Sequence, residues 1–286
     1  VTYFGLHAHG RVPVMLNFTS GVSNIKAAIK AAGLKKVLSA KRFINQAKLE
    51  DLMEELGKVA EIVWLDDVRK TIGLQDKLYR LMAGMMPRKF RVKTDPHSTG
   101  VILFTSGSTG QSKGAFSTHR AVVQGTFNYI AQALVVLQLA TEDGTVSVDR
   151  PQHAALLTVP LFHVTGEVPI MLVSFAIGRK IVMMPKWNVV TAMELIQREK
   201  ITNFTGVPLM SFELMSHPDR HKYDLSTLQG LSGGGAPRPV EHVKRIAEEF
   251  PTAPPALGYG LTETNGVCAA ASGQLFQHAP QSAGLT

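Results

Sequence analysis

The chain has 286 residues, 45% of them hydrophobic and 18% charged, with a net charge of +8. Apolar residues are too frequent for a disordered chain and suffice for a sizeable core in two lobes. The positive charge would suit an anionic ligand, a nucleic acid or a membrane surface. The single cysteine, Cys268, excludes a disulfide framework and a multi-cysteine metal site, and fits a reducing compartment.

Short β-like runs alternate with helix-like stretches between residues 11 and 81. We predict extended segments at residues 12–16, 36–39 and 62–65, and helices at residues 22–32 and 44–56. Such alternation is typical of βαβ units on a mainly parallel sheet. We therefore predict an α/β fold.

Residues 84–98 are polar, basic and interrupted by Pro87 and Pro96, which predicts a connector. The densest basic cluster of the chain, residues 87–93, lies here. We interpret it as a solvated connector rather than a nucleic-acid patch, because no interleaved series of aromatic residues accompanies it.

A loop of small residues at 104–114, Phe-Thr-Ser-Gly-Ser-Thr-Gly-Gln-Ser-Lys-Gly, follows the apolar run at 101–103. Its glycines can turn backbone N–H groups inward, its hydroxyls add donors, and Lys113 adds a positive charge. A flexible linker or an idle surface loop is the alternative, but strand-like segments flank the loop on both sides. The loop therefore predicts a phosphate cradle, although it does not fit the usual NTPase pattern because Gly114 follows the lysine.

We predict a long helix at residues 119–139, with His119 and Arg120 at its start as an end cap and a surface charge. A buried-type strand at residues 154–159 then leads to Phe162 and His163. A histidine after such a strand is more often a satisfied core or rim residue than a catalyst.

The next elements continue the α/β alternation. We predict a helix at 167–176, a strand at 180–184, a helix at 191–200, and a strand running into a helix at 203–208. The longest apolar run, residues 168–177, is too short to span a bilayer. No secretory signal stands at the start, so we expect a cytoplasmic protein without a transmembrane segment, whose contact with membranes is at most peripheral.

Two glycine-containing motifs occupy the last third of the chain. Gly233-Gly234-Gly235 follows a predicted strand at 228–231 and precedes a predicted helix at 239–249, so it is either a tight turn or bare backbone for a flat ligand. Further on, Tyr259 stands between two glycines and could stack on a base. Thr262 and Glu263 add a phosphate donor and a ligand for a hard cation.

These motifs together resemble those of the adenylate-forming enzymes, which include acyl-CoA synthetases, aryl-acid ligases and luciferases. The loop resembles that family's phosphate loop except at Ser112, where proline is usual. The segments Pro-Leu-Phe-His-Val-Thr-Gly at 160–166, Gly-Gly-Ala-Pro at 234–237 and Gly-Tyr-Gly-Leu-Thr-Glu at 258–263 resemble the next motifs in family order. The resemblance covers essentially the whole chain.

The resemblance implies roles for individual residues. Lys113, Thr262, Glu263 and His163 would be catalytic, and Glu263 would bind Mg²⁺. Phe162, His163, Val207 and Gly235 would border the acid. The nucleotide would be bound by the loop, the glycine run and the tyrosine turn, through Thr105, Ser106, Gly107, Ser108, Thr109, Gly110, Lys113, Gly234, Gly235, Ala236, Pro237, Gly258, Tyr259, Gly260 and Thr262.

The resemblance also implies an architecture of stacked, mainly parallel sheets flanked by helices. We expect a partial first α/β lobe at residues 1–93 and a second lobe with the site motifs at 94–286. The ribose-binding aspartate, the hinge and the small C-terminal domain of the family cannot be placed in this sequence. We therefore expect it to be a fragment.

By resemblance, the complete enzyme activates a carboxylic acid with ATP, releases pyrophosphate and transfers the acyl group to CoA. Apolar residues around Phe162, Met171, Val207 and Met210 favour a fatty acid. Three alternatives stay open: an acyl-carrier protein as the acceptor thiol, a nucleotide-binding pseudoenzyme that acts in an assembly, and, ranked lowest, a nucleic-acid-binding module.

Overall fold

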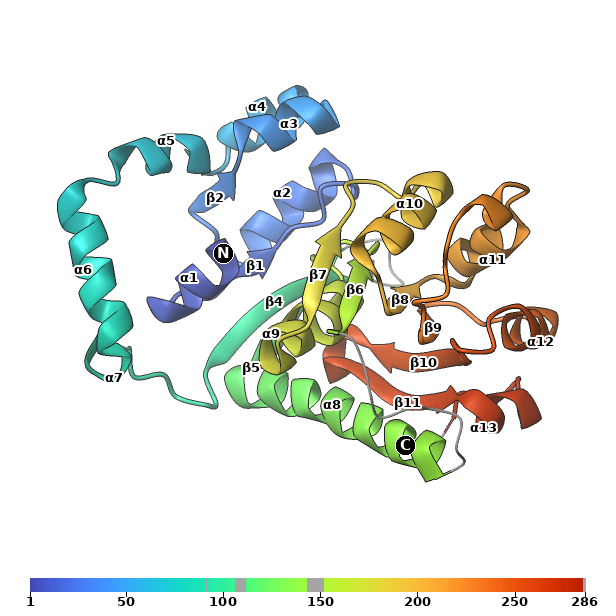
Figure 1. Cartoon of the computed structure of the whole chain (residues 1–286). Coiled ribbons are helices and arrows are strands. Elements are labelled where there is room, and N and C mark those ends of the chain that lie inside the picture. Colours follow the sequence, from blue (N-terminus) through green and yellow to red (C-terminus); the bar gives the residue numbers. More distant parts are fainter. Residues whose placement is uncertain (91, 106–111, 143–151, 285–286) are drawn as a thin grey trace. The chain divides into compact units, whose positions relative to one another are not determined.

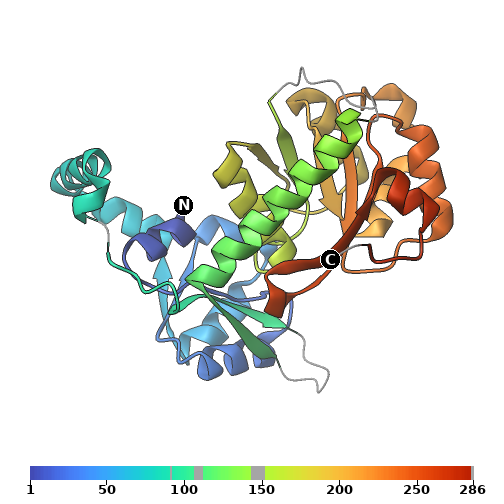
Figure 2. The ribbon, with the colours of Figure 1, turned by 90° about the horizontal axis from the view of Figure 1, so that it is seen from below.

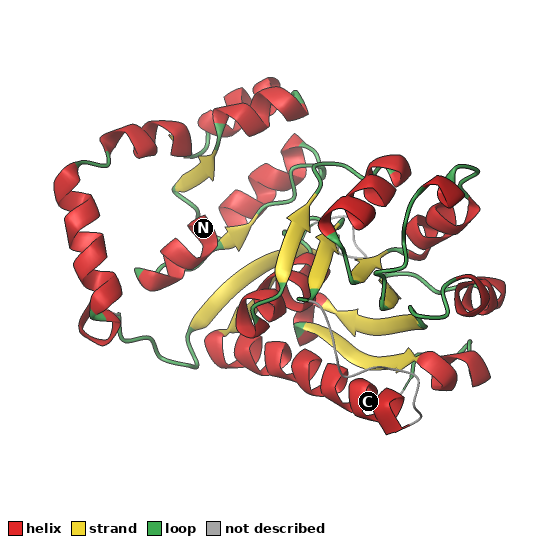
Figure 3. Cartoon of the chain, in the orientation of Figure 1, coloured by secondary structure: helices red, strands yellow, loops and turns green. Residues whose placement is uncertain are grey.

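Helices and strands alternate along the computed structural model, which describes residues 1–90, 92–105, 112–142 and 152–284 (Figure 3). The α/β class predicted from the sequence is confirmed. The chain divides into two compact units, Val1–His119 and Arg120–Thr286. The division that we expected between residues 93 and 94 stays a prediction.

The first unit contains two small sheets. β1 (Val14–Met15) pairs in parallel with β4 (Thr99–Thr105), and β4 pairs antiparallel with β5 (Lys113–Thr118). β2 (Lys36–Ser39) pairs in parallel with β3 (Glu61–Trp64). The helices of this unit are α1 (Thr2–Ala8), α2 (Val22–Ala31), α3 (Lys41–Ala47), α4 (Glu50–Gly57), α5 (Leu65–Thr71), α6 (Leu74–Met85) and α7 (Pro87–Phe90).

The core of the first unit forms between α2 and α4. Ile25 and Ile29, one helical turn apart on α2, belong to the same buried cluster as Leu52 and Leu56 on α4. The single helix predicted at residues 44–56 is wrong, because Lys48 has a φ of 53° and separates α3 from α4. The predicted connector at 84–98 is also partly helical, since α6 extends to Met85 and α7 follows.

One six-stranded sheet organises the second unit. Its strand order is β11-β10-β9-β8-β6-β7, in which all neighbours are parallel except the antiparallel pair β10–β11 (Figures 1 and 2). The strands are β6 (Ala154–Leu157), β7 (Lys180–Met183), β8 (Asn203–Gly206), β9 (Gly230–Gly234), β10 (Pro255–Leu261) and β11 (Gly266–Ser272).

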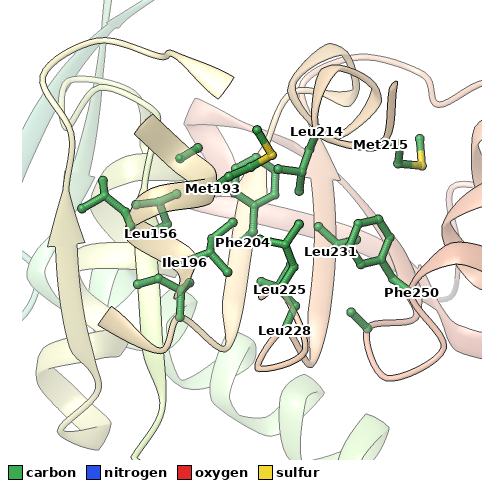
Figure 4. Close-up of a cluster of buried hydrophobic side chains, with 14 of the residues drawn as sticks. Leu156, Met193, Ile196, Phe204, Leu214, Met215, Leu225, Leu228, Leu231 and Phe250 are labelled. Atoms are coloured by element: carbon green, nitrogen blue, oxygen red, sulfur yellow. The ribbon is translucent and has the colours of Figure 1, made fainter. Parts of the chain in front are cut away.

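Helices cover both faces of this sheet, as the apolar parallel strands require. Leu156, Phe204 and Leu231 on three adjacent strands are fully buried on one face (Figure 4). α10 (Val189–Glu199), α11 (Pro208–Ser216) and α12 (Val240–Glu249) pack there. On the other face Ala155 and Leu157 contact Ile170 of the π-helical segment η1 (Gly166–Leu172), which continues into α9 (Val173–Ile177).

The long helix α8 (His119–Glu142) packs on the β10–β11 hairpin. Burial raises the pKa of Tyr129 to about 12, and its hydroxyl oxygen accepts a hydrogen bond from the Val267 backbone. A β-carbon added at Gly266 would lie 2.4 Å from that hydroxyl, so the position accepts no side chain. The remaining elements are the 3₁₀ turns η2 (Arg220–Lys222) and η3 (Thr262–Thr264) and the helix α13 (Gly273–His278).

Three strands differ from the sequence prediction. β10 was not predicted, and it places Tyr259 within a strand instead of a turn. β9 begins at Gly230 and continues through Gly234, so Gly233 and Gly234 are part of the strand, and Gly235 follows it. β11 and α13 were not predicted, because the Ala-rich stretch at 266–272 has little strand propensity of its own.

Candidate active site

Most of the residues predicted to bind nucleotide or acid lie at one edge of the large sheet. The strands β10, β9, β8 and β6 are successive parallel neighbours, so their carboxyl ends meet at the same edge. Ligands of open α/β sheets bind outside this edge. The predicted site residues that follow these strands in the chain are Phe162 and His163 after β6, Val207 after β8, Gly235, Ala236 and Pro237 after β9, and Thr262 and Glu263 after β10.

The glycines of β9 and β10 form a strip of bare backbone. Gly234 pairs with Gly258 in the parallel register. A β-carbon added at Gly234 would lie 3.2 Å from the Gly258 carbonyl oxygen, which is tighter than ordinary van der Waals contact. Gly235 follows with a φ of +75°, a conformation that favours glycine. The strip therefore keeps side chains away from the strand ends, and a flat ring could approach the backbone there.

Tyr259 is presented by an irregular stretch of β10. The register with β11 shifts between Tyr259 and Gly260. A β-carbon added at Gly260 would lie only 1.6 Å from the Gly266 carbonyl oxygen, so the close approach of the two strands requires glycine. The Tyr259 side chain is 54% exposed. Its ring is consequently available to a ligand.

Thr262 and Glu263 lie on a turn that hydrogen bonds hold in place. The Thr264 hydroxyl donates to the Gly266 carbonyl (2.9 Å) and accepts from the Leu261 amide (3.2 Å). Asn265 closes the turn with a φ of 57°. The Glu263 carboxylate is exposed on this fixed turn, where it can bind a cation.

A second fixed turn carries Phe162 and His163. The His163 amide donates to Pro160 O (3.1 Å), and the Gly166 amide donates to His163 O (2.9 Å). A β-carbon added at Gly166 would lie 2.4 Å from Pro160 O. The Phe162 ring is buried with its centroid 5.0 Å from that of the imidazole. Partial burial lowers the pKa of His163, which favours the neutral form of the imidazole.

The phosphate loop belongs to the first unit, and the structure describes its two ends. Thr105 and Lys113 face each other as the last pair of β4 and β5, with a 3.5 Å hydrogen bond from the Thr105 hydroxyl to Lys113 O. Lys113 is exposed. The other predicted loop residues, Ser106, Gly107, Ser108, Thr109 and Gly110, lie outside the described residues.

A small cavity of about 210 Å³ adjoins these ends within the first unit. Thr105 and Ser112 line it together with Asn17, Ser20 and Asn24 from the β1–α2 turn and the start of α2. Sequence reasoning missed this contribution. Its only signal was the cluster of polar turn residues at 17–20.

Sequence reasoning also missed a buried arginine beneath the glycine strip. Arg238 is 4% exposed, and its Nη1 donates to Ser211 Oγ at 3.3 Å. Its Nε and Nη2 have no hydrogen-bond partner in the part of the chain that the structure describes. Burial lowers the pKa of Arg238 to about 10. A β-carbon added at Gly233 would lie 2.5 Å from Nη2, so this glycine makes room for the guanidinium.

The family model of the AMP-binding enzyme matches residues 1–286. The chain belongs to the AMP-binding enzyme family. The resemblance to adenylate-forming enzymes that the motifs indicated is thereby confirmed.

Curated relatives of this AMP-binding chain include CoA ligases. It is 31% identical over 220 residues to a probable CoA ligase of Humulus lupulus. The match covers 74% of this chain and 37% of the ligase. It is 31% identical over 176 residues to the long-chain-fatty-acid–CoA ligase of Bacillus subtilis (strain 168), covering 61% of this chain and 29% of that one. The AMP-binding chain thus spans less than half the length of these relatives.

Two of the solved structures that share this fold are bacterial proteins. The o-succinylbenzoate CoA synthetase of Bacillus subtilis, in complex with its acyl-adenylate intermediate, matches with a TM-score of 0.75 and 19% identity over 99% of this chain and 64% of that one. The N-terminal domain of FACL13 from Mycobacterium tuberculosis matches with a TM-score of 0.75 and 20% identity, also over 99% and 64%. At this identity the likeness establishes the fold alone.

Proposed function

We propose that this AMP-binding chain provides the nucleotide and acid sites of an enzyme that activates a carboxylic acid as its acyl-adenylate. The observation that carries the proposal is the convergence, at one sheet edge, of the glycine strip, the exposed Tyr259 and the fixed Thr262–Glu263 turn. The family match over the whole chain supports it.

On the nucleotide side, the bare backbone of Gly234 and Gly235 would face the adenine, and Ala236 and Pro237 continue this border. Tyr259 would stack on the ring, for which its exposure is suited. Gly258 and Gly260 keep the backbone on either side of the tyrosine free of side chains. Such an arrangement would bind the base mainly by stacking and shape complementarity, because a flat uncharged ring makes its largest contact with a flat surface.

The reaction itself joins two anions, the carboxylate and the α-phosphate of ATP. A carboxylate oxygen would bond to the α-phosphorus while the bond to the leaving pyrophosphate breaks. Catalysis of such a step depends on positioning and charge neutralisation. We assign the α-phosphate to the Thr262 hydroxyl, and the β- and γ-phosphates to Lys113, Thr105 and the loop residues Ser106–Gly110.

Glu263 is the residue we assign to Mg²⁺. The described part of the chain has no group of three or more His, Cys, Asp or Glu side chains that could hold a metal ion. A lone exposed carboxylate fits Mg²⁺, which often takes one or two protein ligands and completes its shell with phosphate oxygens and waters. The ion, when bound, neutralises phosphate charge.

The acid side would be formed by Phe162, His163, Val207 and Gly235. The buried Phe162 gives an apolar wall, and the neutral imidazole of His163 can orient the carboxylate without forming an ion pair. A β-carbon at Gly206 would lie 2.8 Å from Met210 Sδ, so a second apolar side chain adjoins the end of β8. We propose a fatty acid as substrate and CoA as acceptor thiol, with an acyl-carrier protein as the alternative acceptor.

The proposal is tested by measuring acid-dependent pyrophosphate release by the full-length protein with ATP, Mg²⁺ and a panel of acids. Glu263→Gln should lower the rate by about a hundredfold, because it removes a charge that acts on the phosphates. Glu248→Gln, which changes an exposed carboxylate on α12, is the matched control and should leave the rate unchanged.

A near-wild-type rate in the Glu263 variant would contradict the assignment of Mg²⁺. Binding of ATP without pyrophosphate release with any acid would contradict adenylate formation and favour a nucleotide-binding protein without turnover. A best rate with a short or aromatic acid would overturn the fatty-acid assignment alone.

A further inference from the structure

The helix α6 (Leu74–Met85) has an apolar face that nothing in the described part of the chain covers. None of its residues is buried. Leu74, Leu78, Leu81 and Met85 are 73%, 52%, 62% and 75% exposed, and Met82 beside them is 47% exposed. In Figures 1 and 3 the helix is a separate segment between α5 and α7.

The spacing of these residues places them on one side of the helix. Positions 74, 78, 81 and 85 follow the helical repeat of three and four residues, so their side chains form one stripe. The charged residues Asp76, Lys77 and Arg80 occupy the remaining circumference. A stripe of large apolar side chains in water is unfavourable, so α6 is suited to a partner that accepts apolar groups.

The charge around the stripe indicates which partner. Residues 74–93 contain six basic residues and one acidic residue. Two aromatic side chains lie beside the cations: the Tyr79 and Phe90 rings meet edge to face at 5.3 Å, and the Arg80 guanidinium lies 5.9 Å from the Tyr79 ring centroid. Leucines and methionines on one face, with flanking lysines, arginines and aromatics, are typical of helices that lie in the interface of an anionic bilayer.

The helix is suited to lie on a membrane rather than to cross one. Among the described residues, no helix is both long and apolar enough to span a bilayer. An apolar groove of another protein would accept the stripe, but it would not explain the excess of cationic side chains around it. The anionic headgroups of a membrane would, because they attract each lysine and arginine near the surface. We propose that residues 74–90, which begin with α6 and end with α7, bind the surface of an anionic phospholipid membrane.

Sedimentation of the protein with vesicles tests this proposal. Vesicles of equal parts phosphatidylglycerol and phosphatidylcholine should bind the protein, and binding should weaken as salt rises; vesicles of phosphatidylcholine alone should bind it far less. The double variant Leu78→Gln, Leu81→Gln should bind anionic vesicles more weakly than the wild type, by about tenfold or more. Met183→Gln, at an exposed apolar residue of β7, is the matched control and should bind as the wild type does.

A second variant separates the electrostatic part from the apolar part. Arg88→Gln with Lys89→Gln should also weaken binding by about tenfold or more, and its residual binding should depend less on salt. Both variants change only exposed residues, and unchanged circular dichroism would establish that they fold. Hydrogen exchange of residues 74–85 should slow when anionic vesicles are added, which reports directly on this helix.

Several outcomes would overturn the proposal. Equal binding by the Leu78/Leu81 variant and the wild type would remove the stripe from the interaction. Slow exchange of residues 74–85 without vesicles would mean that the protein itself covers the helix, and a wild-type dimer that the variant loses would assign the stripe to a second copy. RNA binding that depends on Arg88 and Lys89 but not on the leucines would assign the cluster to nucleic acid. None of these results depends on the acid-activating reaction.

Discussion

β8 and α6 both carry large apolar side chains, yet these side chains lie in opposite environments. Phe204 on β8 is fully buried between neighbouring strands and helices, whereas Leu74 on α6 is 73% exposed. The sheet packs on both of its faces, so the position of each strand end is set by many contacts. The helix has no buried residue. The part of the candidate site at the strand ends therefore lies on a closely packed sheet, whereas α6 presents an apolar surface to its surroundings.

Removal of a central core side chain should have the largest effect on stability. Phe204→Ala leaves a cavity beneath the strand ends and should lower the free energy of unfolding by about 3–5 kcal/mol. Urea denaturation measures this change. Phe116→Ala, at a phenylalanine that is 69% exposed on β5, is the control and should change stability by about 0.5 kcal/mol or less. Similar losses in both variants would mean that the sheet core does not dominate stability.

The buried Arg238 allows a second test, with an effect of the opposite sign. Its charge is taken out of water, and among the described residues its guanidinium donates to the Ser211 hydroxyl through Nη1 alone. Arg238→Leu should therefore raise the free energy of unfolding of the ligand-free protein, by about 1–3 kcal/mol. The exposed Arg42→Leu is the control, with no comparable gain expected. Destabilisation by Arg238→Leu would indicate that the guanidinium has partners in solution that offset its burial.

Substitution on the apolar face of α6 should have the smallest effect. Leu78→Gln removes a side chain that is 52% exposed, and glutamine and leucine have similar helix propensities. The free energy of unfolding should change by about 0.5 kcal/mol or less in the same urea experiment. A loss close to that of Phe204→Ala would mean that α6 is packed in solution, which would remove the contrast between the two segments.

The sequence predicted the alternation of elements and the motifs at the strand ends because both have local signals. Buried parallel strands are short apolar runs, and the residues that follow them are small or polar. The prediction failed where the signal was not local. Lys48 breaks a helix without glycine or proline nearby, and β9 runs through three glycines because strand pairing overrides their low propensity.

The motifs of the candidate site could be predicted from the sequence, but their arrangement in space could not. Nothing in the residue pattern fixes the strand order, which brings the segments after β6, β8, β9 and β10 to one edge. Arg238 was missed because a surface and a buried arginine look alike in sequence. Its one indirect sign was Gly233, whose missing side chain makes room for the guanidinium.

The strand order also separates two kinds of change over evolution. The residues assigned to the acid leave the sheet mainly from β6 and β8, and those assigned to the nucleotide leave from β9 and β10. On these proposed assignments, substitutions after β6 and β8 would alter the acid site without changing the close contact of Gly260 with Gly266 between β10 and β11. The proposed acid site and the proposed nucleotide site are therefore carried by different strands of one sheet, so that either could change while the other is kept.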